Sequence, residues 1–229
     1  MMENVIETKN LNKVFGIGDL AIKALDDVNF HIQKGEFTAL VGPSGSGKTT
    51  LLNMIGGLDE PTSGNVILDG QDISQLKKSE MTKFRQDHIG FVFQAYNLIP
   101  VLSAYENAEF IMLLQNVPAK ERKERVYKLL EEVGLKGKEK NKPGEMSGGQ
   151  QQRVAVVRAL AAQPAYILAD EPTANLDSKS TSDLLDLMYR LNQEENMTFI
   201  FATHDQRVMD RAKRIVYLED GKIIKDEVH

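Results

Sequence analysis

The sequence predicts an α/β fold whose central sheet is mostly parallel. Residues 37–41 form an apolar run of strand length that leads into a glycine-rich loop and a helix. Two further apolar runs, 166–169 and 198–203, are separated by residues 178–195, which carry apolar side chains on one helical face. Strands that alternate with helices are typical of a parallel sheet, and such sheets bind ligands at the carboxyl ends of their strands.

The N-terminal part of the chain, residues 5–70, is rich in β signals. Residues 28–32 alternate apolar and polar side chains, as a half-buried strand does, and a Lys-Gly-Glu turn then leads to the strand at 37–41. Residues 65–68 predict a further strand that ends at an Asp-Gly turn. Residues 16–24 predict a loop that is longer than a simple hairpin needs.

The middle of the chain predicts a helical subdomain inserted into the α/β core. Residues 80–87 are polar and compatible with a helix, and residues 89–93 return to a strand. Residues 103–162 then show helices and no convincing strand. One of these helices starts at Pro118 and ends at Gly134, which follows the preference for Pro at helix starts and Gly at helix ends.

The C-terminal end of the chain predicts a β-hairpin. Residues 215–219 and 222–225 flank an Asp-Gly pair, which is a strong hairpin signal. The sequence contains no internal repeats and no low-complexity tracts.

The composition is that of an ordinary globular protein of 229 residues. Hydrophobic residues make up 41% and charged residues 27%, so the chain is neither disordered nor fibrous. The net charge is −5 and Lys and Arg are scattered, which disfavours a nucleic-acid partner. The absence of Cys excludes disulfides and Cys-ligated metals, and fits a reducing compartment.

The sequence predicts neither a membrane span nor a signal peptide. The longest apolar stretches, 110–114 and 199–202, are far shorter than the roughly 18 residues that a membrane-spanning helix needs. The first residues lack both a basic region and a long apolar run. We therefore expect a cytoplasmic protein whose role at a membrane, if it has one, is performed through a partner.

The glycine-rich loop after residues 37–41 matches the pattern GxxxxGK[ST] and is followed by a helix. Its glycines allow backbone N–H groups to curl around a phosphate, and the helix directs its positive end at the same anion. Lys48 adds charge for the β- and γ-phosphates, and Thr49 offers a hydroxyl to Mg²⁺. The residues predicted to bind nucleotide here are Gly42, Pro43, Ser44, Gly45, Ser46, Gly47, Lys48, Thr49 and Thr50.

Two carboxylates follow the apolar run 166–169, at the end of a predicted buried strand. Asp170 can hold the Mg²⁺ shell, as the second acidic element of phosphate-loop enzymes does. Glu171 points the other way and is free to polarise an attacking water. The alternatives are a helix cap or surface turn for Asp170 and a solvated bystander for Glu171.

A second predicted anion site lies at the start of the helix that begins after Met146. Free N–H groups at a helix N-terminus, two glycines and a serine hydroxyl favour an anion. The alternative is a Ser-Gly-Gly helix cap without a ligand. The residues predicted to contact nucleotide here are Ser147, Gly148, Gly149 and Gln150.

These motifs resemble, in order and spacing, those of the ATP-binding-cassette (ABC) ATPases over nearly the whole chain. The matching parts are the phosphate loop, Gln94, 146–150, 166–171, 174–177 and His204. The resemblance implies a P-loop NTPase core with a mostly parallel sheet, an N-terminal antiparallel β subdomain and an inserted helical subdomain. It implies one domain, 1–229, with a nucleotide-binding core at 1–94 and 163–229 and a helical subdomain at 95–162.

The resemblance also implies roles for single residues. Two cassettes of this family dimerise head to tail, so Ser147 and Gly149 would contact the ATP held by the other copy. Gln94 would reach Mg²⁺ and the attacking water and report to the membrane partner. His204 would contact the γ-phosphate and orient the water, and Asp177 would couple the two sites at the dimer interface.

Phe15 matches the aromatic position that stacks on adenine in this family. Most members have Tyr there, and Phe keeps the π face while it loses the hydroxyl. The alternatives that the residues leave open are a core aromatic role for Phe15 and a purely structural role for His204.

Within the family, the chain resembles the branch of the lipoprotein-releasing ATPase LolD, the macrolide exporter MacB and related peptide-resistance cassettes. The residues that carry this resemblance are 16–24, 91–94, 97–100 and 169–177. It implies an ATP- and Mg²⁺-dependent ATPase subunit, peripheral on the cytoplasmic face of the inner membrane, that forms an ATP-dependent homodimer. Its partner would be an integral-membrane permease with an extracytoplasmic domain.

Two other functions remain open for such a chain. One is a regulatory clamp on a membrane complex, as in the cell-division cassette FtsE, because the same residues serve both roles. The other is a soluble ABC ATPase that acts on DNA or the ribosome. The second is disfavoured, because such proteins usually carry two cassettes or a long coiled-coil insertion.

Overall fold

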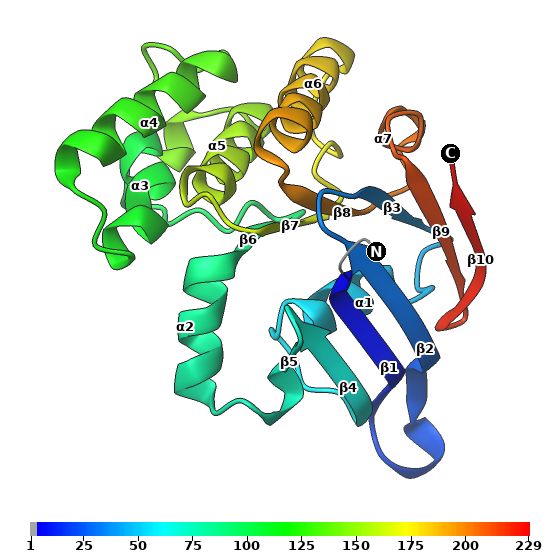
Figure 1. Cartoon of the computed structure of the whole chain (residues 1–229). Helices are drawn as coiled ribbons and strands as arrows, with labels where there is room; N and C mark the ends of the chain where they lie inside the picture. Colours follow the sequence, from blue (N-terminus) through cyan, green and yellow to red (C-terminus); the bar gives the residue numbers. More distant parts are fainter. Residues whose placement is uncertain (1–3) are drawn as a thin grey trace.

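The computed structural model describes residues 4–229, which form two sheets with a helix between them (Figure 1). The first sheet is antiparallel, with the strand order β2-β1-β4-β5. Its strands are β1 (Asn4–Phe15), β2 (Ile22–Gln33), β4 (Ser63–Leu68) and β5 (Gln71–Asp72). The predicted N-terminal antiparallel β subdomain is confirmed.

The second sheet is mostly parallel and has the strand order β10-β9-β3-β8-β7-β6, in which only β10 runs antiparallel to its neighbour among the described strands. Its strands are β3 (Phe37–Val41), β6 (Ile89–Val92), β7 (Tyr166–Asp170), β8 (Thr198–Ala202), β9 (Arg214–Glu219) and β10 (Lys222–Val228). Strands β3, β7 and β8 are buried almost throughout, which is why they read as continuous apolar runs.

The helices lie on both sides of the second sheet (Figure 1). They are α1 (Lys48–Ile55), α2 (Lys78–His88), α3 (Ala104–Leu114), α4 (Ala119–Glu132), α5 (Gly148–Ala161), α6 (Ser178–Glu195) and α7 (Gln206–Met209). Short 3₁₀ turns are η1 (Gly18–Leu20), η2 (Ile73–Gln75) and η3 (Pro143–Glu145). The segment predicted to be helical therefore contains α3, α4 and α5.

Helix α1 packs between the two sheets and joins their cores. Leu51 and Ile55 of α1 are fully or almost fully buried in one cluster with Leu11 of the antiparallel sheet and with Leu40 and Ile200 of the parallel sheet. Because the glycine-rich loop leads directly into α1, this packing fixes the position of the loop.

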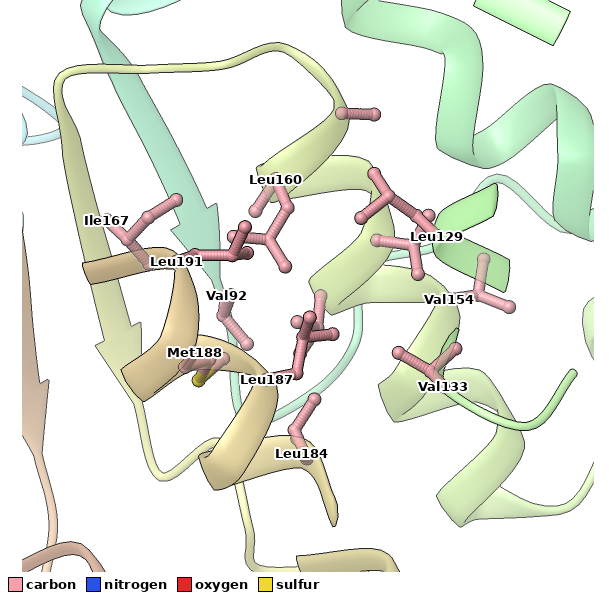
Figure 2. Packing of buried hydrophobic residues seen from close by; sticks show 14 of the residues in the cluster. Val92, Leu129, Val133, Val154, Leu160, Ile167, Leu184, Leu187, Met188 and Leu191 are labelled. Carbon is pink, nitrogen blue, oxygen red and sulfur yellow. The ribbon is translucent and has the colours of Figure 1, made fainter. Parts of the chain in front are cut away.

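A second core lies where the helices α4, α5 and α6 cover the other face of the parallel sheet (Figure 2). Leu187 and Leu191 of α6 lie opposite Leu160 of α5, and Val92 and Ile167 come up from the sheet. The apolar stripe of α6 is thus buried as predicted, and it holds the helical segment against the strands that carry the carboxylates.

Most predicted elements lie close to their observed bounds, and α6 spans 178–195 as expected. The loop predicted over 16–24 is shorter, because Phe15 pairs with Ile22 and Val14 with Lys23 across the hairpin. The turn of η1 occupies much of what remains.

Candidate nucleotide site

The glycine-rich loop connects the end of β3 to the start of α1 and contains two positions that require glycine. Gly42 has a φ of +155°, and a Cβ atom there would lie 2.0 Å from the carbonyl oxygen of Leu218. Gly47 has a φ of +106°, and its Cβ would lie 2.6 Å from the carbonyl oxygen of Ala24. Any side chain at these two positions would force the loop away from the neighbouring strands.

Lys48 is the first residue of α1, and its side chain folds back across the loop. Its Nζ donates to the carbonyl oxygens of Gly42 and Pro43, at 2.8 and 2.9 Å. Because both acceptors are uncharged, the positive charge of the ammonium group is not neutralised and remains available for a phosphate.

Asp170 ends β7 and faces the loop. Thr49 Oγ1 lies 3.1 and 3.0 Å from the two carboxylate oxygens of Asp170. Burial raises the pKa of Asp170, and the hydrogen bond from Thr49 only partly opposes this. A partly buried carboxylate with one neutral donor is a site that a cation would stabilise. The helix-cap alternative for Asp170 does not hold, because the residue ends a strand of the parallel sheet.

Glu171 follows Asp170, and its carboxylate is held by two residues at the end of β8. His204 Nδ1 lies 2.6 Å from Oε1 of Glu171, and Thr203 Oγ1 donates to Oε2 at 3.2 Å. The side chain of Glu171 is only 14% exposed, whereas that of His204 is 79% exposed. The carboxylate of Glu171 is therefore mostly shielded from solvent, and contacts to both of its oxygens hold its orientation.

A cavity of about 550 Å³ brings these residues together. Its lining comes from the phosphate loop, from the segment after β6, from the ends of β7 and β8, and from β2 of the other sheet. The lining residues are Ala24, Gly42, Pro43, Ser44, Gly45, Ser46, Gly47, Lys48, Thr49, Thr50, Gln94, Asp170, Glu171 and His204. The carboxyl ends of parallel strands thus form the cavity, as the fold class predicts.

The second predicted anion site does not line this cavity. Ser147 caps α5 and forms a reciprocal capping box with Gln150, in which the Gln150 N–H donates to Ser147 Oγ at 3.3 Å and the Ser147 N–H donates to Gln150 Oε1 at 3.0 Å. Close to this helix end, a Cβ on Gly149 would lie 3.2 Å from the carbonyl oxygen of Asn175. The structure therefore places two separate predicted phosphate sites on one chain.

Phe15 and Asp177 also lie outside the cavity lining. Phe15 is 45% exposed, so the core alternative for this residue does not hold. The ammonium group of Lys13 lies 4.9 Å from the centre of the Phe15 ring. Asp177 caps α6, and its carboxylate accepts hydrogen bonds from the N–H and the hydroxyl of Ser180.

Sequence reasoning missed Ala24 and Thr203. Thr203 directly precedes His204 at the end of an apolar strand, so the sequence already indicated that it lies close to the site. Ala24 belongs to the antiparallel sheet and reaches the cavity only through the packing of the two sheets, so no local pattern indicates it.

Within residues 4–229, no helix is both long and apolar enough to cross a membrane. The same residues contain no group of three His, Asp or Glu side chains that could hold a metal ion without other ligands.

Comparison with known proteins agrees with this geometry. The family described as ABC transporter matches residues 25–174. A lipoprotein-releasing system ATP-binding protein LolD from Pseudoalteromonas translucida is 41% identical over 230 residues, covering 100% of this chain and 99% of that protein. A macrolide export ATP-binding/permease protein MacB from Hyphomonas neptunium is 46% identical over 99% of this chain, which corresponds to only 35% of the MacB protein.

A solved structure gives the same result for the fold. The ATP-binding cassette MJ0796 of Methanocaldococcus jannaschii, described as a dimeric post-hydrolysis state bound to ADP and Pi, is 44% identical to this chain, with a TM-score of 0.93. The similarity covers 97% of this chain and 98% of the MJ0796 chain. With the phosphate loop, the paired carboxylates and the capped α5 in their places, the chain belongs to the ABC transporter family, as one of its ATP-binding and ATP-hydrolysing cassettes.

Proposed function

We propose that this chain is the ATPase subunit of a transporter of the lipoprotein-release or macrolide- and peptide-export type, bound peripherally to the cytoplasmic face of its membrane. The names of the relatives LolD and MacB support this type of permease. In MacB the cassette is about a third of a longer chain described as an ATP-binding/permease protein, which supports a permease as the partner of the separate cassette. That permease would carry an extracytoplasmic domain.

The observation that carries this proposal is the separation of the two predicted phosphate sites. Ser147 and Gly149 do not line the cavity around Lys48, so we expect a nucleotide held there to lack contact with the α5 N-terminus of the same chain. A head-to-tail homodimer would place the α5 N-terminus of one copy on the nucleotide of the other, and the dimeric state of MJ0796 supports this. Residues 95–162 would then act as the helical subdomain, and Asp177 would lie at the interface.

Three residues that line the cavity carry oxygen atoms suited to bind Mg²⁺. Thr49, Gln94 and Asp170 offer hydroxyl, amide and carboxylate oxygens, which are the ligands this hard cation prefers. Because they do not form a complete metal site, the remaining ligands would come from nucleotide phosphates and water. When bound, Mg²⁺ would supply positive charge against the phosphates.

The chain's own residues would perform hydrolysis in a defined arrangement. The loop N–H groups and Lys48 would bind and orient the phosphates, and Phe15 would stack on the adenine. Glu171 would accept a proton from the attacking water, while Thr203 and His204 hold its two carboxylate oxygens. Water adds to the γ-phosphorus and ADP leaves, so ATP and water give ADP, phosphate and a proton.

An apolar groove of about 370 Å³ supports a permease partner. It lies between α2, α3 and the segment after Gln94, and its lining includes Phe91, Phe93, Ile99 and Phe110. The segment 95–104 would receive a helix of the permease, because Asn97 and Ile99 of this segment lie in the groove wall.

The experiment that tests this proposal uses the Glu171→Gln chain, which should bind ATP without hydrolysing it and accumulate as a dimer. We expect this chain, with ATP, to co-purify from detergent-solubilised source membranes with a permease that has a large extracytoplasmic domain. Lys48→Ala in the same background is the matched control and should recover much less permease. Recovery of a cell-division complex, or of no membrane protein, would contradict the export assignment.

A further inference from the structure

The segment that follows Gln94 runs along α5 and is anchored to it by Arg158. The guanidinium of Arg158 donates through Nη1 to the carbonyl oxygen of Asn97 at 2.6 Å and through Nη2 to that of Tyr96 at 2.9 Å. The planar fork of Arg suits two neighbouring acceptors. Arg158 is partly buried, and this burial lowers the pKa of its guanidinium. Hydrogen bonds in such surroundings are stronger than exposed ones.

Tyr96 makes a second contact, at the other end of α5. A Cβ atom on Gly148 would lie 2.8 Å from Tyr96 Oη, so the phenol occupies the space that a side chain at this position would take. Gly148 is the first residue of α5, whereas Arg158 lies near its last turn. The two positions are about 15 Å apart along the helix axis at a rise of 1.5 Å per residue. Residues 96–97 are therefore linked to α5 at two points, near its start through the phenol of Tyr96 and near its last turn through Arg158.

The backbone of this segment requires such support. Tyr96 and Asn97 have φ values of +58° and +51°, in the left-handed region. Non-glycine residues hold this conformation only where the surrounding structure stabilises it. The two hydrogen bonds from Arg158 go to the carbonyl groups of these same residues. If the two hydrogen bonds from Arg158 were lost, the backbone of residues 96–97 would lose the contacts that stabilise its left-handed conformation.

We infer that Tyr96 and Arg158 are positioning residues that lock the segment after Gln94 to α5 and so set the position of the α5 N-terminus relative to the nucleotide cavity. Gln94 lines that cavity, two residues before Tyr96. Asn97 and Arg158 also line the apolar groove, so an occupant of the groove would touch the same anchor. The inference rests on the proposed head-to-tail dimer, in which the α5 N-terminus meets the partner's nucleotide.

The test uses Tyr96→Ala and Arg158→Met, each in the Glu171→Gln chain. We expect dimer formation at saturating ATP, measured by analytical ultracentrifugation, to weaken about tenfold or more in both variants. Neither side chain lines the nucleotide cavity. The affinity of the dilute monomer for a fluorescent ATP analogue should therefore stay within about twofold of the parent value.

Two further variants separate positioning from a general loss of stability. Arg125 of α4 donates to the carbonyl oxygen of Ala161 at the end of α5 but does not contact residues 96–97, so Arg125→Met should leave dimer formation unchanged. Arg158→Lys keeps the charge without the two-pronged fork, so it should weaken the dimer less than Arg158→Met.

Each outcome decides between the proposals. Normal dimer formation by both Tyr96→Ala and Arg158→Met would overturn the inference and leave the dimer intact. An equal fall in nucleotide affinity and dimer formation would overturn it as well, because it would indicate general unfolding. A parent Glu171→Gln chain that stays monomeric with saturating ATP would instead refute the head-to-tail dimer itself.

Discussion

At the scale of single residues, Glu171 illustrates how a local conformation is held for chemistry. Its φ of +45° lies in the left-handed region, which costs a non-glycine residue about 1–2 kcal/mol. The backbone N–H of Glu171 donates to the carbonyl oxygen of Ala202 at 2.9 Å, and its carboxylate contacts Thr203 and His204. These contacts offset the strain and leave the carboxylate in one orientation, which a general base requires.

Thr203 provides a direct test of this orientation. Thr203→Val keeps the shape of the buried side chain but removes the hydroxyl that donates to Glu171, so kcat for ATP should fall about tenfold. KM should change little, because Thr203 does not line the cavity. Thr203→Ser, which keeps the hydroxyl, should retain most of the activity. Steady-state kinetics of the three chains would show this, and equal kcat values for Val and Ser would contradict the positioning role.

Two neighbouring glutamines at the start of α5 differ in their surroundings. Gln152 is fully buried, and neither polar atom of its side chain has a hydrogen-bond partner in the described part of the chain. Gln151 donates to the carbonyl oxygen of Met146 at 3.1 Å. A buried amide without a partner is destabilising, whereas a satisfied one is stabilising.

Substitution of these glutamines by Met should therefore have opposite effects on stability. Gln152→Met removes the unsatisfied amide and should raise the free energy of unfolding by about 1 kcal/mol. Gln151→Met removes a hydrogen bond and should lower it by about the same amount. Urea unfolding of both variants measures this difference. A loss of stability in Gln152→Met equal to that in Gln151→Met would show that the Gln152 amide makes favourable contacts after all.

At the scale of elements, Arg214 joins three strands through an ionic network in which the guanidinium is buried and the carboxylate of Asp226 is 38% exposed. From β9 it pairs with Asp226 of β10 at 2.7 Å and with Glu36 at 3.2 Å, and it donates to the carbonyl oxygen of His31 in β2. Its own side chain is only 7% exposed. The guanidinium therefore connects the antiparallel sheet to the edge of the parallel sheet.

Arg214→Met should destabilise the fold by about 2 kcal/mol at neutral pH, because it leaves the largely buried Glu36 and the partly exposed Asp226 without their cation. The hydrogen bond from Arg214 holds the pKa of Asp226 below its usual value. The contribution of Asp226 is thus complete above the unfolded pKa of about 3.9 and is lost as the pH falls through the lower folded pKa.

The stability difference between Arg214→Met and the unsubstituted chain should accordingly be constant from neutral pH down to about pH 5 and shrink below about pH 4. Thermal unfolding at a series of pH values measures it. Lys225→Met on the neighbouring exposed surface is the control and should show little effect, since exposed ion pairs contribute little. A difference that does not depend on pH would show that Asp226 is not part of the stabilising network.

At the scale of the whole molecule, the proposed function requires two copies of the chain, because the cavity around Lys48 and the N-terminus of α5 are separate. Mixing Ser147→Arg chains with Lys48→Ala chains tests this arrangement. Each variant alone should have almost no ATPase activity. The mixed dimer should contain one composite site with an intact loop and an intact α5 N-terminus, and should recover up to about a quarter of the unsubstituted activity if the dimers form at random.

The matched control for this experiment is a mixture of Ser147→Arg chains with chains that carry both Ser147→Arg and Lys48→Ala. No heterodimer in that mixture has an intact α5 N-terminus, so its activity should stay at the background level. Activity that does not rise in the first mixture above this control would contradict contact in trans.

The nature and order of the elements could be predicted from the sequence, because they depend on local patterns. The alternation of strands and helices, the apolar face of α6 and the glycines before α1 are properties of neighbouring residues. The chemistry of Lys48 and Glu171 was also predictable, because it follows from the type of residue and from its local motif. That motif is the glycine-rich loop for Lys48 and the end of an apolar strand for Glu171. The hairpin loop at 16–24 was predicted too long, since pairing across the hairpin extends both strands.

Only the tertiary structure decided which distant residues meet. Ala24 reaches the nucleotide cavity because the antiparallel sheet packs on α1, and Thr203 reaches Glu171 because β7 and β8 are neighbours. The contact of Tyr96 with the start of α5 likewise joins segments far apart in sequence. The sequence by itself determined the elements and the reactive groups, whereas these contacts depend on how buried apolar surfaces pack against one another, which no local pattern specifies.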